Sequence, residues 1–172
     1  PSLRSSTSSP EGAIVAFPLA LRYTFPMAHV ALHTHFVFST KHREPTIVPQ
    51  WRPRLHEYIG GIVRNSNCRL IAAGGAADHI HLLIGMHQSV APADLMRLVK
   101  CNSSGWVHDE LKCPCEWQNS YGAFAVSKSG LDSVIDYVNT QEEHHRGMTF
   151  EEEYLAFLKK HGVEHDPKYV FE

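Results

Sequence analysis

From Met27 onward, hydrophobic and polar residues alternate with the two-residue period of a β-strand. This pattern predicts a first strand that runs from Met27 to Ser39. The preceding residues 1–26 are rich in Ser and Pro and show no clear period, so we expect them to form a flexible leader outside the core. Met27 is a candidate for the natural start, and a targeting peptide is an alternative that Arg4 and Arg22 support only thinly.

After this strand, helical and strand spacings follow one another along the chain. The expected elements are a helix from Arg52 to Asn65, a hairpin of strands at 69–73 and 79–86 joined by Gly74-Gly75, a helix from Pro92 toward Glu110, a strand at 122–126, a helix after Ser127 that ends before Gly147, and a last helix that starts at Thr149 and ends before Gly162. The order is βαββαβ followed by two helices. It predicts an α+β, ferredoxin-like fold with an antiparallel sheet, helices on one face and extra C-terminal helices.

Composition limits the possible functions. With 172 residues, 43% of them hydrophobic, residues 27–172 are expected to form a single domain. Lys and Arg number 16 against 18 Asp and Glu, so the net charge of -2 provides no overall basic field and any nucleic-acid site must be a local patch. The 13 histidines modestly favour a metal site, because imidazole is the commonest metal ligand.

The four cysteines do not form a zinc-ribbon or disulfide pattern. Cys68, Cys101, Cys113 and Cys115 are spaced unlike either framework, and reduced thiols of a cytoplasmic protein are the better interpretation. Cys113 and Cys115 could supply two thiolates, but no matching second pair exists. No apolar run approaches eighteen residues, so no membrane span is predicted.

His79 and His81 are the strongest candidates for a metal site. Because they are two residues apart on a strand, both imidazoles lie on one face, with Ile80 on the other. A divalent metal held by such a pair can polarise a phosphoryl oxygen. Asp78 could orient one of the metal ligands without touching the metal, or it could contact the metal itself. The alternative is a half-exposed strand that carries two histidines by chance, and the motif alone does not decide between them.

A second pair, His33 and His35, is separated by Thr34 instead of a bulky apolar residue. Its opposite face therefore has a weaker claim to the core, and we expect a structural or DNA-facing role for it.

Tyr137 and Gln141 supply chemistry that a histidine pair lacks. Four residues apart on one predicted helix, they are expected to project from the same face. A tyrosine hydroxyl, with a reference pKa of about 10, needs a metal-activated phosphate or a base to act as a nucleophile. Gln141 offers a neutral oxygen ligand. Alone, the two would be read as a packed tyrosine and a solvated glutamine, whereas their combination with His79 and His81 favours a catalytic site.

With these residues in this order, the chain resembles the single-tyrosine HUH transposases of bacterial insertion sequences and their domesticated, repeat-associated relatives. The resemblance runs from about Met27 to the end of the chain, and it is carried by the segments 36–45, 73–83 and 137–146. It implies that His79, His81 and Gln141 bind Mg²⁺ or Mn²⁺ and that Tyr137 is the nucleophile.

The resemblance also implies a reaction and partners. Single-stranded DNA is cleaved next to a hairpin, leaving a 5′-phosphotyrosine and a free 3′-hydroxyl that later rejoins strands. Such proteins work as homodimers in the bacterial cytoplasm, and the tyrosine helix of one protomer can complete the site of the other. DNA contacts are expected from local basic residues, namely Lys41, Arg43, Arg97, Lys100 and Lys128. Trp106 and Trp117 are expected to anchor the core or a loop instead.

Three alternatives stay open at this level. A non-catalytic nucleic-acid-binding module can share the ferredoxin-like fold, although the Lys/Arg-Gly-Phe type motif of RNA-recognition domains is missing from the sequence. A metal hydrolase would use water as the nucleophile and form no covalent adduct. A domesticated nuclease that processes repeats would keep the same chemistry on a fixed target.

Overall fold

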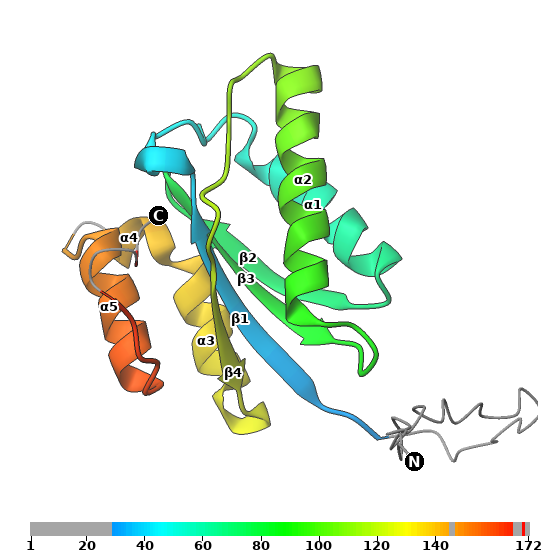
Figure 1. Ribbon diagram of the computed structural model, residues 1–172, viewed down its shortest axis with the longest axis vertical. Helices are drawn as coiled ribbons and strands as arrows, with labels where there is room; N and C mark the ends of the chain where they lie inside the picture. Colours follow the sequence, from blue (N-terminus) through cyan, green and yellow to red (C-terminus); the bar gives the residue numbers. More distant parts are fainter. Residues whose placement is uncertain (1–28, 145–146, 167–169, 171–172) are drawn as a thin grey trace, which may run out of the picture.

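The computed structural model describes residues 29–144, 147–166 and 170, and its centre is a four-stranded antiparallel sheet (Figure 1). The strands lie in the order β2-β3-β1-β4. Their bounds are Leu32–Ser39 for β1, Arg69–Gly75 for β2, His79–Met86 for β3 and Gly122–Val126 for β4. The predicted βαββαβ order and the α+β class are confirmed, and the leader at 1–26 and Met27 lie outside the described residues.

Helices α1 (Arg52–Asn65) and α2 (Pro92–Leu111) cover one face of the sheet (Figure 1). Alternate side chains of the two central strands point into this layer, and the buried set includes Phe36, Phe38, Ile80, Leu82 and Ile84. Removing these apolar side chains from water is the main favourable term that holds the two helices on the sheet. The predicted placement of the two crossover helices on one face is therefore confirmed.

The opposite face carries the C-terminal helices α3 (Leu131–Asn139), α4 (Gln141–His144) and α5 (Phe150–Lys160) (Figure 1). Two small apolar clusters pack them against the sheet, one around Leu83 and Val138 and the other around Val37, Phe124 and Phe150. Because strand residues alternate between faces, the side chains between those of the main core, including His35, His79 and His81, lie in this second layer.

Local signals predicted most element starts and ends, with three differences. β1 begins at Leu32 instead of Met27. Gly74 and Gly75 still belong to β2, so the turn between β2 and β3 is made by residues 76–78. The third predicted helix is broken at Thr140, which separates α3 from α4. Among the residues that the structure describes, none of the helices has the length and apolar content that crossing a membrane requires.

Gly74 allows α3 to approach the sheet closely. A Cβ atom on this residue would lie 1.8 Å from the carbonyl oxygen of Val138, which is a backbone atom and cannot rotate away. The neighbouring Gly75 has a φ of 140°, a conformation that side chains disfavour. Glycine at position 74 therefore sets the distance of α3, and hence of Tyr137, from the strand.

We expect Gly74→Ala to lower the free energy of unfolding by about 1–3 kcal/mol, because the added methyl group must push the α3 backbone away. Urea denaturation measures this loss. Gly61→Ala is the matched control, since a Cβ there meets nothing within 4 Å and lies inside α1, where alanine should stabilise by about 0.5–1 kcal/mol. Equal stability of Gly74→Ala and wild type would contradict the close packing.

Candidate active site

His79 and His81 project from β3 into the layer between the sheet and the C-terminal helices. Their side chains are 1% and 0% exposed. Ile80 and Leu82 point to the opposite core, as the two-residue period predicts. Both imidazoles are thus held between packed layers, with Phe150 of α5 stacked on the His79 ring at a centroid distance of 4.7 Å.

Asp78 orients His79. The Nδ1 atom of His79 lies 2.7 Å from Asp78 Oδ1, so Nδ1–H donates to the carboxylate and the ring lone pair is left on Nε2. Burial opposes ionisation of Asp78, but hydrogen bonds from His79 and Arg43 outweigh it and lower the Asp78 pKa to about 2. A carboxylate behind a histidine is a common arrangement at metal sites, because it fixes the tautomer of the ligand.

His81 is oriented by His35, a contact that sequence reasoning missed. His35 Nε2 lies 3.0 Å from His81 Nδ1, and the two residues are separated by 46 positions in the chain. Burial, with smaller effects from the charges of His161 and Lys160, lowers the pKa of His35 to about 4. His35 is 2% exposed, so it cannot face DNA in this arrangement. Of the two roles expected for it, the structural one fits its burial.

Tyr137 lies next to this pair in the same chain. Its ring centroid is 5.9 Å from that of His81 and 6.1 Å from that of His35, with both pairs close to perpendicular. Phe157 of α5 packs against it on another side at 5.7 Å. The tyrosine is half-buried, so the structure brings the predicted nucleophile and one predicted ligand together at the edge of the buried site.

Gln141 reaches the same site from α4. The predicted single helix through Tyr137 and Gln141 is wrong because the chain turns at Thr140, yet Gln141 is 1% exposed. Its Nε2 atom donates to the carbonyl oxygen of Tyr137 and to Glu153 Oε1, each at 3.3 Å. Its Oε1 atom is buried and has no hydrogen-bond partner among the residues that the structure describes, which is costly for an amide oxygen unless a ligand supplies the missing contact.

Glu153 of α5 is the acidic member of the site, and sequence reasoning missed it. Its side chain is 3% exposed, and Glu153 Oε2 lies 3.6 Å from His81 Nε2. A sequence signal existed, because Glu153 sits three residues after Phe150 and next to Tyr154 on the apolar stripe of α5, where a carboxylate is out of place.

The donor atoms fit a divalent cation. Potential ligand atoms of His79, His81 and Glu153 all lie within 4.8 Å of one another, and among the described residues this is the one group of three or more His, Cys, Asp or Glu with such spacing. Gln141 adds a buried amide oxygen that no other described residue contacts by a hydrogen bond. Imidazoles suit ions such as Zn²⁺ and Fe²⁺, whereas carboxylate and amide oxygens suit Mg²⁺ and Mn²⁺, so this mixed set fits a divalent cation without selecting one. All four cysteines are free, and none belongs to this group.

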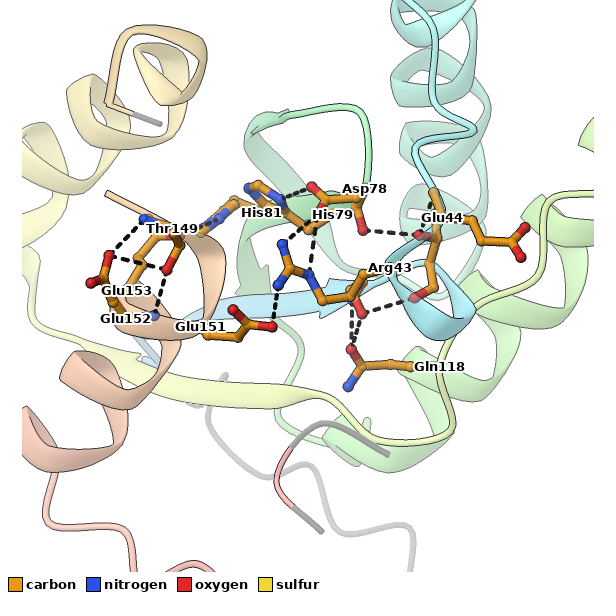
Figure 2. A network of polar contacts seen from close by, with 12 residues as sticks. Arg43, Glu44, Asp78, His79, His81, Gln118, Thr149, Glu151, Glu152 and Glu153 are labelled. Atoms are coloured by element: carbon orange, nitrogen blue, oxygen red, sulfur yellow. Dashed lines mark hydrogen bonds and ion pairs between the residues drawn. The ribbon is translucent and has the colours of Figure 1, made fainter. Parts of the chain in front are cut away.

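Arg43 ties α5 to the site (Figure 2). Its guanidinium contacts Asp78 Oδ2 through Nε and Nη2, at 3.2 and 2.8 Å, and forms an ion pair with Glu151 at the start of α5. The same group lies 5.3 Å from the centre of the Phe150 ring. Arg43 was expected to contact DNA, and that expectation stays a prediction. In the structure its charge connects the Asp78 carboxylate with the helix that carries Glu153.

The other predicted DNA contacts differ in their surroundings. Lys41 pairs with Glu116 at 2.6 Å on the surface. Lys100 donates to three backbone carbonyls at 118–120, and burial lowers its pKa to about 8, so its ammonium group fastens a loop. Arg97 and Lys128 are exposed. Trp117 is a buried anchor, as predicted, and its Nε1–H donates to Ser103.

Glu153 should make stability depend on pH when no metal is present. Burial and the charge of Asp78 raise the Glu153 pKa from 4.5 to about 8. Between these values the folded state keeps a proton that the unfolded chain has released, so this group lowers stability as pH rises. In EDTA, we expect the melting temperature of wild type minus that of Glu153→Gln to fall between about pH 5 and about pH 8. Taking this difference removes the pH dependence that histidines contribute to both proteins. A difference in melting temperature that does not change with pH would contradict the burial of an ionisable Glu153.

Known proteins share the fold of this chain, and one family model matches most of it. Residues 28–141 match the family model described as "Transposase IS200 like". A protein from Deinococcus radiodurans R1 described as a candidate transposase shares the fold at 22% identity and a TM-score of 0.55, over 66% of this chain and 93% of that one. A REP-associated tyrosine transposase bound to a REP hairpin does so at 14% identity and a TM-score of 0.51, over 85% and 76%. No match is found among curated proteins. Since the family model covers well over half of the sequence, the chain belongs to the family of IS200-like transposases.

Proposed function

We propose that this transposase cleaves and rejoins single-stranded DNA next to hairpins, with Tyr137 as the nucleophile and a divalent cation held by His79, His81, Glu153 and Gln141. The observation that carries the proposal is the position of Tyr137, whose ring lies against His81 beside a buried set of metal-ligating atoms. A tyrosine placed only for packing would not require imidazole, carboxylate and amide donors to converge next to it.

The reaction exchanges one phosphodiester for another. The Tyr137 oxygen forms a bond to phosphorus as its proton is lost, the bond from phosphorus to the 3′ oxygen breaks, and that oxygen leaves as a 3′-hydroxyl. The product is a 5′-phosphotyrosine, so bond energy is conserved and a later 3′-hydroxyl can reverse the step without ATP. When bound, the cation would polarise the phosphoryl oxygen and stabilise the charge that builds during displacement.

The residues around the donors position them for this task. Asp78 holds His79 with its Nε2 lone pair toward the site, and Gln141 holds one oxygen of Glu153 by its amide N–H. Glu153 supplies negative charge that compensates a cation in a buried setting. Mg²⁺ and Mn²⁺ are the ions that the family resemblance favours, while two histidines and a glutamate also suit Zn²⁺.

DNA requires a change at this site before it can react. The histidines, Gln141 and Glu153 are all at most 3% exposed, so a phosphate group cannot contact them in the present arrangement. Phe150 and Phe157 of α5 lie against the rings of His79 and His81, at 4.7 and 6.4 Å. We infer that side chains of α5 shift when DNA binds.

The partners follow from the same proposal. The structural neighbour bound to a REP hairpin supports a hairpin-bearing DNA substrate. Exposed Arg97 and Lys128 are the proposed phosphate contacts, because Arg43 and Lys100 make contacts within the protein and Lys41 is paired with Glu116 on the surface. A homodimer in the bacterial cytoplasm is proposed, and Tyr137 lies beside His81 of its own chain, which favours a site completed within one protomer.

Denaturing electrophoresis tests the proposal. The protein is incubated with single-stranded DNA from its genomic flanks, labelled at either end, with Mg²⁺ or Mn²⁺. We expect a 3′-labelled strand to move with the protein and a 5′-labelled strand to appear as a shorter free fragment, both suppressed by EDTA. Free fragments with either label would instead identify a metal hydrolase, and intact DNA would identify a binding module.

A further inference from the structure

His35 and His81 face one another from adjacent strands. β1 and β3 pair so that His81 lies opposite Val37, which makes His35 the diagonal neighbour of His81 on the same face. Their ring planes are inclined to one another by 28°, with centroids 5.1 Å apart and a 3.0 Å distance between His35 Nε2 and His81 Nδ1. The 3.0 Å distance between the two ring nitrogens is that of a hydrogen bond between two imidazoles.

The direction of this hydrogen bond decides what His81 can do. A neutral imidazole has one N–H and one lone pair. If His35 donates, the proton of His81 lies on Nε2 and points toward Glu153, which makes the pair a closed structural network. If His81 donates from Nδ1, its lone pair is on Nε2, which is the nitrogen 3.6 Å from Glu153 Oε2.

We propose that His35 is a positioning residue that accepts the Nδ1–H of His81 and so holds His81 Nε2 ready to bind the metal. This inference rests on the proposed metal site. It parallels the role of Asp78 toward His79, where a carboxylate accepts Nδ1–H at 2.7 Å. The two ligands are thus oriented by two different acceptors, one acidic and close in sequence, the other neutral and from the neighbouring strand.

The packing around His35 keeps its ring in this position. Phe157 lies 5.2 Å away and Tyr137 6.1 Å away, each near perpendicular to the imidazole. These contacts would hold a phenyl ring as well, but phenyl cannot accept a hydrogen bond. What histidine adds over a phenyl ring at this position is therefore its ring nitrogen.

Substitution separates packing from hydrogen bonding. His35→Phe keeps a ring and removes the acceptor, His35→Gln places an amide near the former Nε2 atom, and His33→Phe on the same strand face is the control. By Mn²⁺ titration followed by electron paramagnetic resonance, we expect His35→Phe to bind about 10–100-fold more weakly, and the other two variants to stay within about threefold of wild type. Adduct formation by His35→Phe should recover as Mn²⁺ is raised. Unchanged Mn²⁺ affinity in His35→Phe would overturn the proposal.

A measurement on wild type does not depend on whether the variants fold. In metal-free protein labelled with ¹⁵N-histidine, long-range ¹H–¹⁵N spectra should show His81 protonated at Nδ1 and His35 with an unprotonated Nε2. A proton on His81 Nε2 would contradict the proposed direction. His79→Ala distinguishes failure of the metal site from failure of the role of His35. If His79→Ala still binds Mn²⁺, both the metal site and the role of His35 are overturned. If His79→Ala loses Mn²⁺ binding but His35→Phe keeps it, only the role of His35 is overturned.

Discussion

Tyr137→Phe is expected to abolish the covalent protein–DNA adduct, with a fall of at least about 1,000-fold in strand cleavage. The variant loses the one oxygen that can form the phosphotyrosine bond. Its ring contacts with His81, His35 and Phe157 are retained, so folding and metal binding should stay as in wild type. A single-turnover assay with 3′-labelled DNA measures the loss.

Tyr121→Phe is the matched control for this experiment. Tyr121 is also half-buried, but it packs against Phe36 and under Lys100 on the other side of the sheet. Removal of its hydroxyl should leave adduct formation within about twofold of wild type. Cleavage by Tyr137→Phe at the wild-type rate would show that water or another residue is the nucleophile.

His81→Ala is expected to remove measurable Mn²⁺ binding and to slow adduct formation on the order of 1,000-fold, which corresponds to about 4 kcal/mol of transition-state stabilisation. The reason is geometric, because His81 is the member of the site that contacts His35, Tyr137 and Glu153. Titration with Mn²⁺ and the single-turnover assay report the two effects separately.

His87→Ala provides the corresponding control. His87 follows β3 directly and is exposed, with its Nδ1 near Ser89. Loss of this histidine should change neither metal binding nor cleavage. If His81→Ala kept wild-type affinity for Mn²⁺ and cleaved within tenfold of the wild-type rate, the buried group would be a structural network and not a metal site.

Most of the fold could be predicted because its signals are local. The alternation in β1 and β3, the capping box at Thr149 and Glu152, and the apolar spacing of α1 depend on residues a few positions apart. The errors lie where distant packing decides the outcome. Gly74 and Gly75 suggested a turn, but Gly74 is small because the backbone of Val138 lies against it.

Part of the site was predictable for the same reason. His79 and His81 share a face by strand geometry, and Tyr137 and Gln141 are four positions apart, so these residues could be named from spacing and resemblance. The roles of the basic residues could not be predicted, because the sequence does not show which group each positive charge contacts. Arg43 serves as an ion-pair bridge between Asp78 and Glu151 in this fold.

The sequence by itself determined that two histidines lie side by side on a strand and that a tyrosine follows on a helix. Only the tertiary structure placed Glu153 and His35 with them. Glu153 is 72 positions from His81 and belongs to a helix whose face is chosen by packing on Val37 and Phe124. His35 meets His81 through strand register, across 46 positions. Local periodicity shows which way a side chain points, whereas its partners depend on which layers of the fold close over it.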